Sequence, residues 1–380
     1  MKKGRKKGYL LIRNKLLKEG GSFYEEKGQD ILRNEKVFVG LEDPKKTWQL
    51  CVRSGGVIVH KTSMPAKFEV LRNYFDNRFP ECQIQVIYEA GFKGFELHDE
   101  LEEKGWDCIV TPPHTVTEKK CQRKKNDRTD CRRLAKNLEN GDYHSCFVPD
   151  KELREDRQIS RTYEQIQEDI TRVCNRIRRT LEFHGLGNGL LPGSWNRAMY
   201  TRVKLYLEDL EISTSLRFSL KVMFNELEHL RQLRKELLQQ LRTLAKSDRY
   251  KERVEILQSA PGIGMFTAIR LVLEWGDVSR FKRKEEFASF LGLVPSDYSS
   301  GEKERQGHIT KQGNSSVRSW LVECSWMAIK HDPVLLDKYR RVLKNCGSKK
   351  KAIVAVARKL AIRLRRILLN GEPYVIGVVE

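Results

Sequence analysis

The stretch that decides the fold is VFVGLEDPKKTWQLCV, residues 37–52. It opens as an apolar run rich in Val and Phe, and a run of this kind predicts a buried β-strand. The run ends at two adjacent carboxylates, Glu42 and Asp43. Because successive side chains of a strand point to opposite faces of a sheet, only one of the two can face a given site. The sequence alone leaves open which one does.

The segments that follow this strand alternate between strand and helix patterns. TWQLCV and VIVHKT predict two more short strands around a Gly-Gly turn. Three antiparallel strands followed by helix, strand, helix and strand predict a mixed sheet with helices against it, in the order of the ribonuclease-H-like fold. The later elements are expected as a helix over 64–79, a strand over 82–90, a helix over 95–105 and a strand over 107–113.

Composition divides the 380 residues into four segments, and the predicted fold class is α/β plus α. A basic N-terminal arm over residues 1–35 precedes the α/β domain over 36–150. Residues 151–250 are charged and carry apolar residues every three or four positions, which predicts a coiled coil or helical hairpin. Residues 251–380 form a mostly helical domain with a polar, serine-containing loop.

The charge of the chain predicts the class of its partner. There are 72 Lys and Arg residues against 51 Asp and Glu, a net charge of +21. An excess of this size usually reflects a polyanionic partner. Nucleic acid is the preferred partner, and a membrane surface is the alternative. No apolar run is long enough to predict a membrane-spanning helix. The nine scattered cysteines predict neither a disulfide framework nor a zinc site, and they fit a reducing cytoplasm.

Four acidic residues occupy positions that suit metal binding. Glu89 ends the strand over 82–90, and Asp127 and Asp130 lie three residues apart where a helical pattern begins. With a carboxylate at the end of the first strand, Glu42 or Asp43, they offer the oxygen ligands that two Mg²⁺ ions, or Mn²⁺ in their place, require for phosphoryl transfer. In a basic chain, this set predicts an enzyme that acts on nucleic acid. The alternative roles are an exposed strand-end carboxylate for Glu89 and helix capping for the two aspartates.

Two motifs in the C-terminal segment are candidate nucleic-acid contacts. PGIG, residues 261–264, places Gly262 and Gly264 at a turn that opens a helix. Backbone N–H groups there can bind phosphate, as in a helix-hairpin-helix, although a plain helix–helix turn has the same pattern. SDYSSGEKERQGHITKQGN, residues 296–314, is the polar loop. The side chains expected to hold phosphates around it, each with a solvated surface as its alternative role, are Arg305, Lys311, Asn314 and Arg318.

The motifs VGLEDPKKTW, YEAGF and KNDRTDCRRLA, with the long block that begins SAPGIGMFTAIRLVLEWG, carry a family resemblance. From residue 36 to about 370 the chain resembles the DEDD-type transposases of the insertion-sequence one-ten family. The resemblance implies a RuvC-like catalytic domain, a coiled-coil insert and a C-terminal transposase domain. It further implies a DNA recombinase of the bacterial cytoplasm and nucleoid that acts on donor and target DNA, is guided by a structured RNA from the element, and assembles through the coiled coil into a homodimer or tetramer.

The resemblance also assigns individual residues. It implies that Glu42, Glu89, Asp127 and Asp130 are the metal ligands, although the family usually has aspartate at the first position. Glutamate moves that carboxylate by roughly 1 Å or more, beyond the ~0.5 Å that catalytic sites tolerate, so Asp43 after a local bulge remains the alternative. The serine before Gly301, Ser300, is the implied nucleophile, with Ser299 as the nearby alternative.

Two alternatives to this function stay open. One is a site-specific DNA invertase or junction-resolving nuclease that works without a guide RNA, since the same acids would serve it. The other is a catalytically inactive nucleic-acid-binding protein, because a glutamate stands at the first acidic position.

Overall fold

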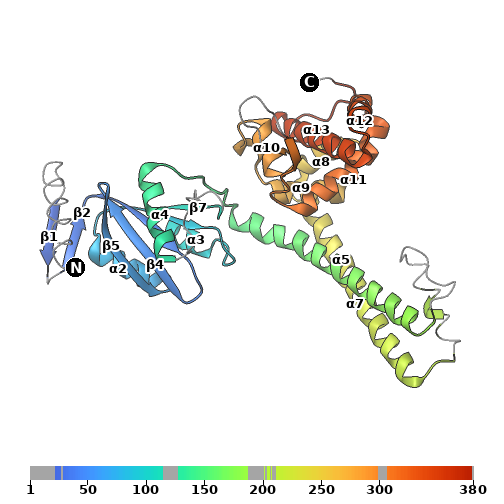
Figure 1. Cartoon of the computed structure of the whole chain (residues 1–380), viewed down its shortest axis with the longest axis horizontal. Coiled ribbons are helices and arrows are strands. Elements are labelled where there is room, and N and C mark those ends of the chain that lie inside the picture. The colour runs from blue at the N-terminus through green and yellow to red at the C-terminus, as the bar shows by residue number, and fades with distance from the viewer. Residues whose placement is uncertain are drawn as a thin grey trace. The chain divides into compact units, whose positions relative to one another are not determined.

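The computed structural model describes residues 22–26, 29–113, 127–186, 201, 203–205, 207, 211–297 and 306–378. The chain divides into two compact units, Met1–Val148 and Pro149–Glu380 (Figure 1). The elements of the first unit are β1 (Ser22–Glu26), β2 (Gln29–Arg33), β3 (Lys36–Glu42), β4 (Thr47–Ser54), β5 (Val57–Pro65), α2 (Phe68–Arg78), β6 (Gln83–Glu89), α3 (Glu96–Glu103), β7 (Asp107–Thr111) and α4 (Asp127–Asn140).

A mixed sheet organises the described part of the first unit. Its five strands stand in the order β5-β4-β3-β6-β7. β4 pairs antiparallel with β3 and β5, whereas β3, β6 and β7 run parallel. The prediction of a mixed sheet with helices against it is therefore confirmed. β1 and β2 pair with each other as a separate antiparallel hairpin, which the sequence pattern of the N-terminal arm does not predict.

One predicted boundary is wrong. The helix expected from residue 64 begins only at Phe68, because β5 continues to Pro65. Met64 pairs with Trp48 across the β4–β5 ladder, and both side chains are buried in the sheet's core. Burial of this pair extends the strand, and the proline then ends it.

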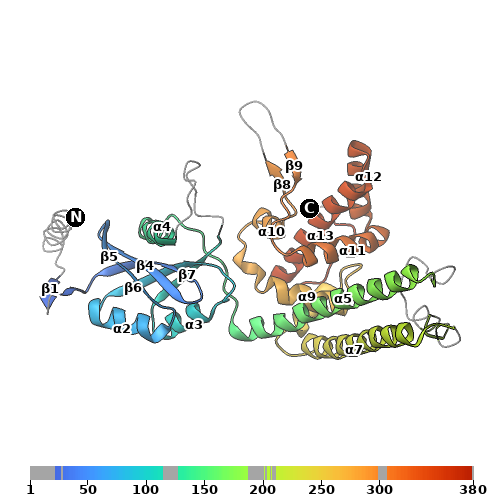
Figure 2. The same cartoon turned by 60° about the horizontal axis from the view of Figure 1, so that its bottom comes forward.

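The two faces of the sheet are covered by different helices. Val37, Val39 and Leu41 of β3 are fully buried, in a core that includes the apolar residues of α2 and α3. The opposite face of β3, which carries Phe38 and Gly40, lies under α4. Figure 2 shows α4 on one side of the sheet and α2 and α3 on the other. The alternating side chains of β3 thus pack into two apolar cores, one on each face of the sheet.

Gly40 allows α4 to approach the sheet closely. A Cβ at this position would lie 2.5 Å from the backbone nitrogen of Ala135 and closer still to the carbonyl oxygen of Cys131. Both atoms belong to the backbone of α4, so a rotamer change would not relieve the overlap. The glycine therefore fixes the distance between β3 and the helix that carries Asp127 and Asp130.

We expect Gly40→Ala to destabilise the first unit by about 3 kcal/mol, at the upper end of overpacking costs, because the helix must move outward. Urea denaturation of the full chain measures the loss, and amide hydrogen exchange should show reduced protection in α4. The control is Gly91→Ala, whose Cβ would meet only the carbonyl oxygen of Glu89 at 3.9 Å. That change should alter stability by less than about 1 kcal/mol. Equal stability of the two variants would contradict the packing argument.

The second unit is mostly helical in its described part. Its elements are α5 (Lys151–Phe183), α7 (Thr214–Ala245), α8 (Lys251–Gln258), α9 (Met265–Trp275), the 3₁₀ helix η1 (Val278–Arg280), α10 (Lys284–Phe290), β8 (Pro295–Asp297), β9 (Gln306–Ile309), α11 (Ser315–His331), α12 (Pro333–Cys346) and α13 (Lys349–Asn370).

The two longest helices, α5 and α7, pack against each other along an apolar stripe (Figures 1 and 2). Asp150 caps α5 and Ser213 caps α7, each accepting a backbone N–H of the first turn. The buried residues that join the two helices are Ile170, Val173, Cys174, Ile177, Leu181, Leu220, Phe224 and Leu227. Outside this stripe the helices are charged, and many of the charges form ion pairs.

The remaining helices surround a second apolar core, of which α9 is the most buried member. Arg270 of α9 is almost completely buried and stacks on Trp320 of α11, with 3.7 Å from its guanidinium carbon to the ring centroid. It also forms an ion pair with Glu164 of α5. Burial lowers the pKa of Arg270 to about 10. This value is still well above neutral pH, so the guanidinium keeps its charge. The contacts tie α5 to the C-terminal core.

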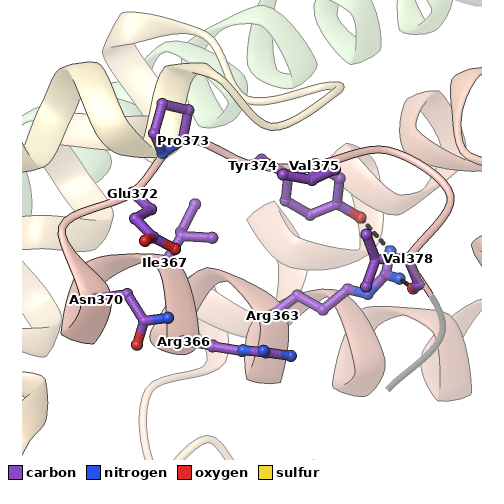
Figure 3. Close-up of a pocket in the computed structure, with 9 residues that line it drawn as sticks. All are labelled: Arg363, Arg366, Ile367, Asn370, Glu372, Pro373, Tyr374, Val375 and Val378. Carbon is purple, nitrogen blue, oxygen red and sulfur yellow. Dashed lines mark hydrogen bonds between the residues drawn. The ribbon is translucent and has the colours of Figure 1, made fainter.

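Residues 371–378 pack back against α13 around a buried ion pair, and Figure 3 shows Arg363, Tyr374 and Val378 of this region. Arg363 lies 2.6 Å from the carboxylate of Asp332, and Tyr374 donates a hydrogen bond of 2.6 Å to the same carboxylate. Burial favours the neutral acid, but the Tyr374 hydroxyl and the Arg363 charge outweigh it and lower the pKa of Asp332. Arg363 also donates to the carbonyl oxygen of Val378. No helix in the described ranges is long and apolar enough to span a bilayer.

Candidate active site at the edge of the mixed sheet

Two of the predicted acids end neighbouring strands. Glu42 is the last residue of β3 and Glu89 is the last residue of β6. These strands run parallel, and their register pairs Leu41 with Tyr88 one residue earlier. Residues in register across parallel strands point to the same face of the sheet. Glu42 and Glu89 therefore occupy adjacent positions at the carboxyl ends of the strands.

Both acids lie on the face covered by α4. Gly40, two residues before Glu42, contacts the backbone of that helix. Ile87, two residues before Glu89, packs with Leu134 of α4. Since side chains repeat every second residue along a strand, Glu42 and Glu89 share this face. Both have partly exposed side chains.

The first turn of α4 lies at the same end of the sheet. Gly40 faces Cys131 and Ala135, whereas Phe38 packs in the cluster that contains Leu138. Moving along β3 toward Glu42 therefore means moving back along α4 toward its first turn. Burial, the neighbouring Cys51 and the negative charge of Glu42 together raise the pKa of the Cys131 thiol to about 12.

Asp127 and Asp130 belong to this first turn. α4 begins at Asp127, whose side chain lies outside the described residues. Asp130 is buried, with 8% of its surface exposed, and forms an ion pair of 3.1 Å with Arg133. The fold thus brings two strand ends and one helix start together. Among the side chains that the structure describes, no group of three or more His, Cys, Asp or Glu is arranged to hold a metal ion.

Asp43 follows the strand and has other partners. Its carboxylate accepts the indole N–H of Trp48 at 2.5 Å and forms an ion pair of 2.5 Å with Lys93. The same carboxylate lines a pocket with residues of α2 and α3, such as Glu69 and Leu97. Asp43 is therefore on the α2/α3 side of the sheet. The β3 register runs without a shift to Glu42, so the structure has no bulge that would bring Asp43 to the α4 side.

The contacts that anchor the other end of α4 have no signature in the sequence. Glu139 accepts the Arg53 Nε–H at 2.6 Å and the backbone N–H of Gly56 at 2.6 Å. These contacts join the last turn of α4 to the β4–β5 turn. The residues are more than 80 positions apart in the chain, so no local pattern predicts the contact.

The PGIG turn connects α8 to α9. Gly264 is the N-cap of α9, and Ile263 between the glycines is buried. Gly262 has a φ of +84°, and a Cβ there would lie 2.6 Å from the carbonyl oxygen of Cys324 in α11. Close helix packing and a left-handed backbone thus explain Gly262 without a ligand. A Cβ at Gly264 would meet no atom within 4 Å.

The serine loop falls between β8 and β9. Ser299, Ser300 and Arg305 lie outside the described residues. Beyond β9, Lys311 is exposed with a φ of +56°. The Asn314 side chain accepts the backbone N–H of Ser316 at 2.9 Å and so caps α11.

Arg318 stabilises the turn that leads into α11. One of its terminal nitrogens donates to three backbone carbonyl oxygens, at distances of 3.3, 2.8 and 3.1 Å; they belong to Leu291, Gln312 and Gly313. Asn314 and Arg318 therefore have structural roles in the described residues, and their contact with phosphate stays a prediction.

Two family models match the chain. A transposase model of the DEDD IS110 type matches residues 41–185, and a model of the IS116/IS110/IS902 transposase family matches residues 254–340. The chain is 26% identical over 362 residues to a putative transposase, y4qE, of Sinorhizobium fredii, covering 94% of this chain and 88% of the relative. It is 27% identical over 276 residues to the transposase for insertion sequence element IS1111A of Coxiella burnetii, covering 71% of this chain and 73% of the relative.

The chain has a mixed sheet followed by a helical unit, and transposase models match both parts. These features define an insertion-sequence transposase, an enzyme that acts on DNA. The chain belongs to the IS110 family of transposases. The resemblance carried by the sequence motifs is thereby confirmed.

Proposed function

We propose that this transposase is a DNA recombinase in which Glu42, Glu89, Asp127 and Asp130 hold divalent metal and Ser300 attacks the phosphodiester. The observation that carries the metal site is the position of Glu42 and Glu89 in register on neighbouring strands, on the face where α4 begins. Three chain segments far apart in sequence contribute acids to one edge of the sheet.

The donor set suits a hard cation. All four proposed ligands are carboxylates, and Mg²⁺ or Mn²⁺ prefers oxygen ligands. When bound, such ions stabilise negative charge on the oxygens that attack and leave in phosphoryl transfer. Glu42 is preferred to Asp43 because the β3 register is unbroken and the Asp43 carboxylate forms an ion pair with Lys93.

The serine step conserves the energy of the phosphodiester bond. The Ser300 hydroxyl oxygen would form a bond to phosphorus, the bond from phosphorus to the departing sugar oxygen would break, and the hydroxyl proton would end on that oxygen. The strand end stays attached to the protein as a phosphate ester, and the reverse reaction with another strand rejoins it. The Ser-Gly pair in the polar loop supports Ser300, with Ser299 as the neighbouring candidate.

Guidance and assembly complete the proposal. A net charge of +21 suits a DNA and RNA assembly, and we propose a structured RNA from the element as guide. The paired helices α5 and α7 are the proposed interface of a homodimer or tetramer. A site-specific invertase or junction-resolving nuclease would use the same acids without the RNA.

Strand exchange by the purified full chain tests this function. The substrate is a plasmid that carries the element with its flanking DNA, in the presence of Mg²⁺, Mn²⁺ or a chelator, with and without the flanking transcript. We expect exchange only with metal, and stimulation by the transcript. Full exchange in chelator would contradict the metal site. Metal-dependent exchange that ignores the transcript would favour the invertase.

A further inference from the structure

The last two helices carry a strong excess of positive charge. Residues 333–370, which form α12 and α13, contain twelve Lys and Arg residues, and Asp337 is the only acid among them. The two helices pack against each other and are joined by a short turn at Gly347, which has a φ of +64° (Figures 1 and 2). The hairpin thus concentrates positive charge that its own sequence does not balance.

Some of these cations have structural partners. Arg363 is buried against Asp332 and Tyr374, as Figure 3 shows in part. Arg365 donates a hydrogen bond to the carbonyl oxygen of Phe281. These contacts stabilise the folded chain, so neither side chain is counted as available to a ligand.

Four other cations lie on these two packed helices: Lys338 and Arg341 on α12, and Arg358 and Lys359 on α13. Burial lowers the pKa of Lys338, and the positive charges of Arg341, Lys359 and Arg358 lower it further. Within the part of the chain that the structure describes, none of the four forms an ion pair with a carboxylate. Like charges brought together in this way repel each other and destabilise the folded state.

The helices α5 and α7 show the ordinary arrangement by contrast. Several of their surface cations form ion pairs with nearby acids. These pairs are Arg172 with Glu168 and Asp169, Arg176 with Glu226, Arg178 with Glu182, and Lys204, between the two helices, with Glu228. The α12–α13 cluster differs because its charge has no counterpart in the described chain.

We propose that Lys338, Arg341, Arg358 and Lys359 bind the phosphate backbone of duplex DNA. DNA is the polyanion that a transposase must hold, and its closely spaced phosphates match several cations on one surface. Arginine can bind a phosphate with two hydrogen bonds, and lysine adds a compact charge. Contacts of this kind position the duplex without reading its sequence. The inference is independent of the carboxylate site and of Ser300.

Salt titration of DNA binding tests the proposal. In the full chain, all four residues are replaced, as Lys338→Gln, Arg341→Gln, Arg358→Gln and Lys359→Gln. Binding to a labelled duplex of about 30 base pairs is measured across a range of salt concentrations. We expect the slope of log affinity against log salt to fall by about 3, and affinity at low salt to fall at least tenfold, because about four phosphate contacts are lost.

A matched control removes the same charge elsewhere. The changes Arg172→Gln, Arg176→Gln, Arg178→Gln and Lys204→Gln lie in the α5–α7 region, where each cation is already paired. Gel filtration should first show that this variant has the oligomeric state of the wild type, because α5 and α7 are the proposed assembly interface. The DNA affinity of this variant should then stay within about twofold of the wild type. Equal loss in the two variants would mean that only net charge matters, and it would overturn the proposal.

Thermal stability separates a binding role from a structural one. Since the cluster repels itself, its neutral variant should melt at the wild-type temperature or above. A lower melting temperature together with lost binding would assign the four residues to the fold. The charge-preserving variant Lys338→Arg with Lys359→Arg should keep its DNA affinity. Unchanged DNA binding in the neutral variant would also overturn the proposal. So would a variant that loses binding to structured RNA but keeps its binding to DNA.

Discussion

Replacing Glu42 with glutamine is expected to reduce DNA strand cleavage roughly a thousandfold or more, because a neutral amide is a poor ligand for a divalent cation. DNA binding should be nearly unchanged, since it depends on lysine and arginine. Glu89→Gln, Asp127→Asn and Asp130→Asn should have the same effect. Cleavage of a labelled substrate, measured beside a binding assay, distinguishes lost chemistry from lost affinity.

Asp43→Asn is the matched control for Glu42, because it removes the adjacent charge on the other side of the sheet. Its carboxylate contacts Trp48 and Lys93, so the change should cost some stability and leave cleavage within about tenfold of the wild type. Severe loss in Asp43→Asn with a mild effect of Glu42→Gln would transfer the role to Asp43. Raised activity in Glu42→Asp would show that the glutamate is a compromise.

Ser300→Ala is expected to abolish a covalent protein–DNA species that the wild type forms. The adduct should resist denaturant and disappear on protease digestion, because a serine hydroxyl holds the strand end as a phosphate ester. Gel separation of labelled DNA under denaturing conditions measures it. DNA binding by the variant should equal that of the wild type.

Ser299→Ala provides the neighbouring control and should still form the adduct. An adduct that persists in Ser300→Ala and disappears in Ser299→Ala would move the nucleophile by one residue. Absence of any adduct in the wild type, on a substrate that is cleaved, would favour water as the nucleophile and reject the covalent mechanism.

Local patterns identified much of the first unit. The apolar run that begins at residue 37 and the alternating pattern of residues 82–90 predicted strands that the structure has as β3 and β6. The start of α4 at Asp127 agrees with the helical pattern that begins there. Such features depend on neighbouring residues, which is why they are visible in sequence. The wrong start of α2 has the opposite cause, since the long-range pair of Met64 with Trp48 keeps the strand extended.

The sequence by itself determined the candidate acids, the spacing that places them at strand ends and a helix start, and the family to which the chain belongs. Only the tertiary structure showed on which side of the sheet Glu42 and Asp43 each lie. A period of two assigns the two residues to opposite faces, but it cannot say which face each helix covers. Gly40 settles this physically, because the backbone of α4 fits against β3 only where no Cβ stands between them, and Glu42 shares that face.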